Sequence, residues 1–559
     1  MTDAATGVTI VLNGEIYNFR SLREELTGVA FRGHSDTEVV LNLYLREGTH
    51  AFARLRGMFA LAIWDPRDNV LHLARDRFGI KPLLIQREAG VLRFGSEAKA
   101  LLALGAQRHL NLAAVRGYLE EGRQNHGPAT FFAGIESLPA AHFMTWRDGV
   151  VEDPTPYWRP QPAARAALTN DEIEERVWET FLDSLEMHLV ADVPVGISLS
   201  SGLDSQLIAR GLAELRRRGR ANGEVHAFTF GFDEKDYDEI RRVNHVDFGL
   251  PLTGHSRRIG PEECLPTLER AIRTFETPLG GLGSVGSFLL TELARAEGIT
   301  VLLSGEGSDE CFAGYRYYHY ARLRELAESG DHPALKRELD GWAATSGERL
   351  DPASDAFRGK VYPASRVMRA PDGSSMEGNA FLGPRLNEVG LPESSFSPAG
   401  PTHLRSAMLR DLTADKLPKL LWFQDRAAMS HGVEVRVPFL DHVLFAMASS
   451  LPPEWLIRDG VAKYALKRVL RRFCGVNAFG PTKHYVATPQ REWLKGPLLK
   501  PLMDWFDSGL LPRLGLIDYP GFRAAYASYA ASPELGNSFF IWKMMDLEAM
   551  LREFFPDGG

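Results

Sequence analysis

The chain has 559 residues, of which 44% are hydrophobic and 24% are charged, and its formal net charge is −8. These values are typical of a soluble globular protein with two or more cores, and the interspersed charges exclude a basic nucleic-acid surface. No apolar run approaches the length of a membrane span, and the opening MTDAATGVTI resembles neither a signal nor a transit peptide. The three cysteines are far apart and odd in number, so we expect free thiols, a cytoplasmic location, and no membrane or nucleic-acid partner.

The first 150 residues predict an α+β domain. VTIVLNGEIYNF (residues 8–19) is typical of a strand that runs into a turn at Asn13 and Gly14, and a helix follows with Ser21 as its cap and Glu24 at the capping-box position. A second helix is expected to begin at Ser35 or Asp36. Four further strands are expected at residues 56–65, 69–76, 82–88 and 91–97. Strands and helices in this order favour layered α+β packing.

Residues 195–210, VGISLSSGLDSQLIAR, are the most informative stretch of the chain. Residues 195–199 predict a buried parallel strand, residues 200–205 a tight polar turn, and residues 206–215 a helix. Such a junction offers free backbone N–H groups and the positive end of a helix dipole to an anion, most simply a nucleotide phosphate. It is neither a Walker loop nor a GxGxxG turn. We interpret Asp204 as a magnesium ligand beside that phosphate, and the alternative is a carboxylate that only caps the helix.

Two more strands predict that this turn belongs to a parallel sheet. Residues 224–232 and 299–303 are apolar strands, and the second runs into another small-polar loop at residues 304–310. Alternation with helices indicates a parallel sheet whose ligands bind at the carboxyl ends of the strands. Residues 320–406 lose this pattern after one helix, and their Pro-, Ser- and Gly-rich part is either a flap over the substrate or a solvated insertion. The remaining residues predict a helical cap.

The N-terminal motifs NGEIYN, SDTE, GMFALAIWD and ARDRFGIKPL, in this order, resemble the glutaminase domain of class II glutamine amidotransferases, in particular of AsnB-type asparagine synthetases. By this resemblance, residues 1–150 are a truncated amidotransferase-like domain. Asn13 and Gly14 match the oxyanion hole of the family, and Glu15 and Asp36 match its glutamine pocket.

The chain departs from the family at the glutaminase nucleophile. The family has a cysteine directly after the initiator Met, whereas this chain has Thr2 there and no cysteine before Cys264. The resemblance therefore implies that the half-site is inactive as written, with sandwich surface and sheet edges left uncovered. A start site assigned too late, a decayed or rebuilt domain, and a second chain that completes the fold are the three explanations.

The later motifs SSGLDS, SGEGSDE, HGVEVRVPFLD and the PTK of FGPTKHYVATP resemble the ATP-pyrophosphatase domain of the same family. Residues 151–170 are then a linker and residues 171–559 the synthetase domain. The implied fold class is α/β: a partial N-terminal-nucleophile-type sandwich, then an adenine nucleotide alpha hydrolase-like parallel sheet with a helical C-terminal cap. Two positions depart from the family, because Ser201 replaces the second glycine of the loop and KHYVATP replaces KxGFxxP.

The family's synthetase site transfers onto this chain by position. The resemblance makes Asp204 and Asp309 magnesium ligands, Glu306 the acidic catalytic residue and Lys483 the lysine at the phosphates. The residues that would bind ATP are Ser198, Leu199, Ser200, Gly202, Asp204, Ser205, Phe230, Ser304 and Gly305. Arg426 and Arg436 either bind a substrate carboxylate or pair with Asp425 and Glu434, and we favour pairing.

We therefore expect an ATP-dependent amide ligase that uses ATP and Mg²⁺. It would activate a carboxylate, by default aspartate, as an acyl-adenylate with release of pyrophosphate, and then amidate it with ammonia; glutamine is a further candidate nitrogen source. One rival is a tailoring ligase like β-lactam synthetases or lasso-peptide cyclases, which use an amine. The other is a non-catalytic nucleotide-binding scaffold. The resemblance leaves open whether the chain forms a homodimer.

Overall fold

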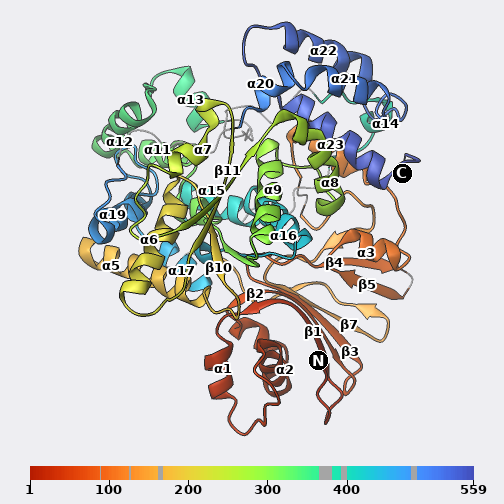
Figure 1. Ribbon diagram of the computed structural model, residues 1–559, viewed down its shortest axis with the longest axis vertical. Coiled ribbons are helices and arrows are strands. Elements are labelled where there is room, and N and C mark those ends of the chain that lie inside the picture. The colour runs from red at the N-terminus through yellow and green to blue at the C-terminus, as the bar shows by residue number, and fades with distance from the viewer. Residues whose placement is uncertain are drawn as a thin grey trace.

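The computed structural model describes residues 1–88, 90–124, 127–161, 168–363, 380–391, 400–479 and 488–558. Figure 1 shows a layered N-terminal part in red and orange, a central sheet with helices on both sides, and a group of C-terminal helices in blue. The flap interpretation for residues 320–406 falls partly on residues 364–379 and 392–399, which lie outside the described ranges. Among the described residues, no helix is long and apolar enough to cross a membrane.

The N-terminal part contains two antiparallel sheets. One has the strand order β1-β2-β3-β7-β8 with β9 beside β7, and the other has the order β5-β4-β6. Its elements are β1 (Thr9–Ile16), α1 (Phe19–Glu25), α2 (Asp36–Glu47), η1 (Gly48–Arg54), β2 (Gly57–Asp65), β3 (Val70–Arg75), β4 (Leu84–Glu88), β5 (Val91–Gly95), α3 (Ala98–Ala103), α4 (Leu112–Glu121), β6 (Ile135–Ser137), β7 (His142–Arg147), β8 (Val150–Val151) and β9 (Thr155–Pro156). The four strands predicted after the second helix are confirmed as β2 to β5.

The turn predicted at Asn13 and Gly14 is wrong, because the structure has strand β1 there. Both residues lie inside the strand, where Asn13 pairs with Ala60 and Gly14 with Phe59 of β2. Gly14 has φ of 139°, and a Cβ there would lie 2.0 Å from the carbonyl oxygen of Met58. The glycine therefore serves the close approach of two strands and not a reversal of the chain. β1 is an edge strand of its sheet, and Val11 on it is exposed.

The helix caps are confirmed in one case and corrected in another. The Ser35 side chain accepts a hydrogen bond from the backbone N–H of Glu38 and caps α2 as predicted. Ser21 does not cap α1, because that helix begins at Phe19 and has Asn18 as its N-cap. Ser21 lies inside the first turn, and its hydroxyl donates to the Asn18 carbonyl oxygen at 3.0 Å. Thr169 and Glu172 form the capping box of the long helix after the linker region.

The part of the chain from residue 170 onward, here called the synthetase part after the resemblance of its motifs, contains the remaining elements. The first group is α5 (Asn170–Met187), β10 (Val195–Ser198), α6 (Leu203–Arg217), β11 (His226–Phe232), η2 (Lys235–Tyr237), α7 (Glu239–Val243), β12 (Thr253–Ile259), η3 (Pro261–Glu263), α8 (Cys264–Phe275), α9 (Leu282–Ala296), β13 (Val301–Leu303) and α10 (Ser308–Phe312). The second group is α11 (Tyr318–Ser329), α12 (His332–Ser346), α13 (Asp355–Val361), α14 (Pro384–Asn387), α15 (His403–Arg410), the π-helix η4 (Asp411–Asp415), α16 (Leu417–Ser430), β14 (Glu434–Arg436), η5 (Pro438–Leu440), α17 (His442–Ser450), α18 (Pro453–Leu456), α19 (Tyr464–Cys474), α20 (Gln490–Lys495), α21 (Leu499–Asp507), α22 (Tyr519–Ala531) and α23 (Phe539–Phe554).

The predicted parallel sheet is confirmed. Five strands pair in the order β12-β11-β10-β13-β14, and every pair is parallel. Helices cover both faces, with α5 and α6 on one side of the strands and α9 and α16 on the other (Figure 1). Strand β11 follows β10 in the chain and pairs with one edge of it, and the later strand β13 pairs with the other edge. Strand order therefore reverses between β10 and β13, which is where open α/β sheets bind ligands.

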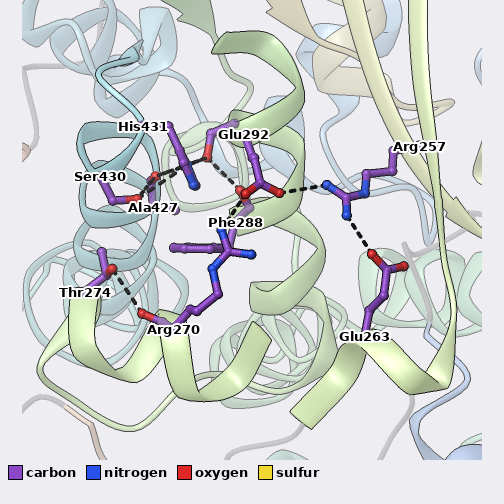
Figure 2. Close-up of polar contacts among 10 residues, drawn as sticks. Arg257, Glu263, Arg270, Thr274, Phe288, Glu292, Ala427, Ser430 and His431 are labelled. Atoms are coloured by element: carbon purple, nitrogen blue, oxygen red, sulfur yellow. Dashed lines mark hydrogen bonds and ion pairs between the residues drawn. The ribbon is translucent and has the colours of Figure 1, made fainter. Parts of the chain in front are cut away.

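Polar contacts link the helices on the α9 face of this sheet. Figure 2 shows the Glu292 carboxylate of α9 between the guanidinium groups of Arg257 on β12 and Arg270 on α8. Arg257 also donates to Glu263 at 2.6 Å, and the His431 ring lies 4.6 Å from that of Phe288. Burial alone would raise the pKa of Glu292, but the hydrogen bonds from Arg270 and Arg257 hold this pKa below its usual range. They fix α8, α9 and the end of α16 against one another.

The two parts of the molecule share one hydrophobic core. A single cluster of buried residues includes Tyr118 and Leu119 of α4 together with Trp542 and Met545 of α23. Polar groups are buried in the same contact, since the Tyr118 hydroxyl donates to Asp546 and the Lys543 ammonium donates to the Leu119 carbonyl oxygen. The N-terminal part is therefore packed firmly on the C-terminal helices.

Candidate functional site

The reversal of strand order brings the two predicted loops together. Asp204 lies in the first turn of α6 after β10, and Asp309 lies in α10 after β13. The ammonium of Lys463 is 2.6 Å from Asp204 Oδ1 and 2.8 Å from Asp309 Oδ1. The Ser308 hydroxyl also donates to Asp204 Oδ1, at 2.8 Å. Two carboxylates from separate loops therefore converge on one small volume at the ends of neighbouring strands.

Glycines make this approach possible. A Cβ on Gly305 would lie 2.7 Å from the Asp204 Cβ, so the two loops touch through their backbones. A Cβ on Gly314 would lie 1.6 Å from Asp309 Oδ1 and 2.2 Å from the Lys463 Cε. Neither position has space for a side chain. Gly305 in the SGEGSDE loop and Gly314 after α10 are thus required by packing around the two aspartates.

Asp204 does not cap α6, which corrects the alternative interpretation of this residue. The N-cap is Gly202, and the helix begins at Leu203, three residues earlier than predicted. The Asp204 carboxylate instead points across to Ser308 and Lys463, as the preceding distances show. Because the helix begins inside the polar loop, the carboxylate stands on a rigid element and not on a mobile turn.

Lys463 is a site residue that our sequence analysis did not identify. It precedes α19 with φ of 51° and ψ of 38°, and its side chain is 3% exposed. Burial alone would lower the pKa of this amine, but Asp204 and Asp309 hold its pKa above the usual value. A lysine just before an amphipathic helix has no distinguishing sequence signal, so only the folded chain reveals its position.

Two further carboxyl groups lie beside the converging aspartates. Burial, with the charges of Asp309 and Asp204 added, raises the pKa of Glu306 to about 7. Burial and Asp309 raise the pKa of Glu310 to about 8, although the Tyr315 hydroxyl donates to it at 2.6 Å. Within the described ranges, the site therefore holds more acidic groups than Lys463 can neutralise, which is an arrangement suited to cations.

The backbone of the loop after β10 is held by its own side chains. The Ser200 N–H donates to the Ser205 hydroxyl at 3.1 Å, and the Gly202 N–H donates to the Ser200 hydroxyl at 3.2 Å. The Ser201 N–H donates to the buried carboxylate of Glu239 at 2.5 Å. The N–H groups of the first turn of α6 follow directly and are those that face outward at a helix N-terminus.

The other predicted nucleotide residues lie on the same edge of the sheet. Ser198 ends β10, and Leu199 is buried with its N–H bonded to the Phe228 carbonyl oxygen, so Leu199 anchors the loop. Phe230 lies on β11, where a Cβ on Gly286 would come within 2.4 Å of its ring. The Ser304 N–H donates to the Arg436 carbonyl oxygen at 2.9 Å. Lys483 lies outside the described residues.

The four residues predicted for the glutamine pocket gather around β1. Asn13 donates to the Ser96 hydroxyl at 3.2 Å, and the Asp36 carboxylate accepts from the Ile16 N–H at 3.0 Å. Burial and the nearby Glu434 raise the pKa of Glu15 to about 7. Cys264 lies on α8 and Cys311 on α10, both buried, and Cys474 ends α19. All three thiols thus belong to the synthetase part of the molecule.

Arg436 connects the glutamine pocket residues with the nucleotide loops. Its Nε donates to Glu434 at 2.7 Å, which confirms the predicted pair, and its guanidinium also lies 3.7 Å from Glu15. Arg426 does not pair with Asp425, which corrects the other predicted pair. Arg426 lies 3.4 Å from both Glu97 and Glu276. Asp425 is taken by the buried Lys81 ammonium at 2.9 Å, because that lysine reaches α16 from the N-terminal part.

The donor set of the site suits a magnesium nucleotide. Mg²⁺ takes few protein ligands and completes its octahedron with phosphate oxygens and water. Asp204 and Asp309 already approach a single cation, the Lys463 ammonium, at hydrogen-bond distance. Among the described residues, no group of three or more His, Cys, Asp or Glu side chains could hold a metal without such help. The fit therefore depends on phosphate oxygens that a nucleotide would bring.

The fold and this site define an α/β protein that combines an amidotransferase-like sandwich with a nucleotide-binding parallel sheet. Residues 176–554 match the asparagine synthase family and residues 1–158 match the glutamine amidotransferase domain family. The chain belongs to the asparagine synthase family, because that match spans more than half of its length.

Several curated relatives match most of the chain. Asparagine synthetase [glutamine-hydrolyzing] 1 of Bacillus subtilis is 29% identical over 509 residues, covering 88% of this chain and 77% of the relative. Asparagine synthetase [glutamine-hydrolyzing] 3 of the same organism is 30% identical over 485 residues, covering 83% and 72%. Amidase chyE of Penicillium rubens is 28% identical over 561 residues, covering 92% and 82%.

Proposed function

We propose that this protein is an ATP-dependent, AMP-forming amide ligase that activates the carboxylate of a small acid, by default aspartate, and transfers it to ammonia. The observation that supports this most directly is the convergence of Asp204 and Asp309 at the point where strand order reverses. The family supports ligase chemistry, and the geometry supports a site in which a polyphosphate and a carboxylate can meet.

The charges of the site explain why these residues suit adenylation. A carboxylate that attacks the α-phosphorus of ATP approaches a like charge, so cations must neutralise both groups. Bound Mg²⁺ would supply most of that neutralisation. Lys463 holds a positive charge at the two aspartates, and Lys483 would add one at the phosphates. Glu306, with its raised pKa, can hold or release a proton near the attacking group at neutral pH.

The nitrogen donor that we propose is free ammonia. Asn13, Gly14, Glu15 and Asp36 are close together, but the three thiols of this sequence all belong to the synthetase part. A substrate amine in place of ammonia is the second candidate, and the similarity to a protein named as an amidase favours it.

The decisive experiment follows the products of ATP cleavage. The 559-residue protein is incubated with ATP, Mg²⁺, aspartate and either ammonium or glutamine, and AMP, pyrophosphate and amide are measured. We expect AMP and asparagine in equal amounts with ammonium and no asparagine with glutamine. AMP with other carboxylates but not with aspartate would transfer the proposal to a tailoring ligase. No pyrophosphate release with any acid would contradict ligase activity and favour a scaffold.

Variants of the converging aspartates test the site itself. We expect Asp204→Asn and Asp309→Asn each to lower the rate of pyrophosphate release by about 100-fold or more, because each removes one charge from the metal position. The matched control is Asp340→Asn on the exposed face of α12, where the carboxylate pairs only with Lys336. Equal rates in all three variants would show that the site lies elsewhere.

A further inference from the structure

A cavity lies where the amidotransferase-like part meets the synthetase part. Its volume is about 600 Å³, and none of the nucleotide-loop residues lines it. One wall comes from the turn after β3 and from residues 127–131 and 137–142. The other wall comes from η4, the first turns of α16 and Thr277, and residues 158–161 also line the cavity. A volume of this size accommodates a ligand as large as a typical drug molecule.

The walls of this cavity are mostly apolar, and their aromatic side chains are held in place by packing. The aromatic residues among them are Phe78, Phe131, Trp158, Trp422 and Phe423. The Trp422 indole N–H donates to the Phe275 carbonyl oxygen at 2.7 Å, and the Phe423 ring stacks 5.5 Å from that of Phe275. The cavity is therefore preformed and suits a ligand with a flat or otherwise apolar body.

Three of the charged side chains that line the cavity already have several partners, although among the described residues the buried Arg77 Nε has none. Arg75 donates to the carbonyl oxygens of Lys81, Leu138 and Gly79, and Arg77 donates to those of Leu55 and Ala53. The Glu276 carboxylate accepts the N–H groups of Ala98 and Lys99, both at 2.7 Å, and lies beside Arg426. These groups shape the cavity, but they have little capacity left for a ligand.

Lys419, on the first turn of α16, differs from these groups. Within the ranges that the structure describes, its amine forms no hydrogen bond or ion pair, although it lines the cavity. Asp411 accepts the Tyr317 hydroxyl at 2.6 Å and Asp415 lies 3.2 Å from Arg410, so the two carboxylates whose charges act on Lys419 have other partners. Burial, followed by the charge of Lys416, lowers the pKa of Lys419 to about 7.

We propose that this cavity binds a small carboxylate with an aromatic or other apolar body, and that the carboxylate pairs with the amine of Lys419. The aromatic walls receive the body, and the exposed Arg159 at the edge of the cavity adds positive charge. An anion is the ligand that supplies the counter-charge which Lys419 lacks. The proposal concerns binding and does not rest on the ligase activity.

Binding of such a ligand is coupled to a proton. An anion beside Lys419 favours the charged amine, so the complex takes up a fraction of a proton near pH 7. The titratable and charged groups that face the cavity or act on Lys419 are Arg75, Arg77, His142, Arg159, Glu276, Asp411, Asp415 and Lys416. Among them, His142 also has a pKa below its usual value, because it is partly buried. Either Lys419 or His142 could take up the proton on binding, so a variant of Lys419 is needed to show which group does.

Isothermal titration calorimetry on the full chain without ATP tests the proposal. The probes are 3-phenylpropanoate and its neutral counterpart 3-phenylpropanamide, each titrated at pH 7 in two buffers of different ionisation enthalpy. We expect 3-phenylpropanoate to bind with proton uptake. Lys419→Met should weaken this binding at least tenfold and abolish the uptake, while the affinity for 3-phenylpropanamide stays within about twofold. Lys336→Met, on the exposed face of α12, is the control and should change neither.

A variant that fills the cavity provides an independent test. We expect Ala414→Trp in η4 to abolish binding of both probes, whereas Ala344→Trp on an exposed part of α12 leaves both unchanged. Circular dichroism and thermal unfolding show that each variant is folded. The proposal is overturned if the wild type binds neither probe, if Lys419→Met binds 3-phenylpropanoate as tightly as the wild type, or if a folded Ala414→Trp retains binding.

Discussion

At the scale of single residues, Lys463 is a buried lysine that pairs with two carboxylates at once. Its ammonium lies within 2.8 Å of both aspartates of the nucleotide loops and is almost fully buried. Without a bound cation, two facing carboxylates would repel each other at this distance. Lys463 therefore stabilises the ligand-free form of the site, and a divalent cation would compete with it for the same oxygens.

This competition leads to a prediction for Lys463→Met. Removal of one partner from a buried ion pair typically costs about 3 kcal/mol of unfolding free energy, so the variant should unfold at a lower temperature in the absence of Mg²⁺. Millimolar Mg²⁺ should restore much of the loss, because it can bind between the unpaired carboxylates. Thermal unfolding with and without MgCl₂ measures both effects. If Mg²⁺ does not change the unfolding temperature of the variant, the two aspartates do not form a metal position.

His319 leads to a prediction about acid stability. It is buried against the Trp342 ring at 5.0 Å, and burial lowers its pKa to about 3. The unfolded chain binds a proton at this position below pH 6.5, whereas the folded chain does not, so stability falls as the pH decreases from 6.5 toward 3. By pH 5 the loss is about 2 kcal/mol. His319→Phe should flatten this part of the curve, which urea unfolding at pH 7 and pH 5 would show; an unchanged slope would contradict the assignment.

At the scale of elements, the parallel sheet and its loops could be predicted because their signals are local. Residues 195–210 contain a strand, a polar loop and a helix within one short stretch, and the structure has all three. The end of β1 could not be predicted this way, because Gly14 owes its place to contact with Met58 on the neighbouring strand. Lys463 lies 259 residues from Asp204 along the chain, so no local pattern could bring them together.

The loop after α10 gives a prediction at this scale. Gly314→Ala would place a methyl group 1.6 Å from Asp309 Oδ1, so the loop or the carboxylate must shift. Displacement of a reacting or binding group by about 1 Å can cost about 100-fold in rate. We expect a folded variant whose AMP-forming rate falls by that order. Gly359→Ala on α13 is the matched control, because nothing lies within 4 Å of its added Cβ. If Gly314→Ala keeps full activity, Asp309 does not contribute to the AMP-forming site.

At the scale of the whole molecule, the two parts are joined by buried charge as well as by a shared core. Arg56 of the N-terminal part donates to Asp441 at 2.5 Å and to Asp183 at 2.6 Å. Glu276 of the synthetase part accepts the first N–H groups of α3 in the other. Interfaces of this kind transmit strain and resist separation, so the parts are expected to unfold together and not one after the other.

The buried pair of Lys81 and Asp425 tests whether the two parts unfold together. The two side chains are 1% and 7% exposed, and they join the N-terminal part to α16 at 2.9 Å. Lys81→Met leaves Asp425 buried without its partner and should lower the free energy of unfolding by about 3 kcal/mol. The double variant Lys81→Met/Asp425→Leu should recover most of that loss, since an apolar pair can replace a buried ion pair.

Urea unfolding, followed by both far-ultraviolet circular dichroism and tryptophan fluorescence, measures these changes. The control is the exposed pair Lys336 and Asp340, whose loss should change the free energy by less than about 0.5 kcal/mol. If the parts form one cooperative unit, both probes give a single coincident transition in every variant. Two separate transitions in the wild type, or a Lys81→Met effect no larger than that of the surface control, would show that the N-terminal part is only loosely attached.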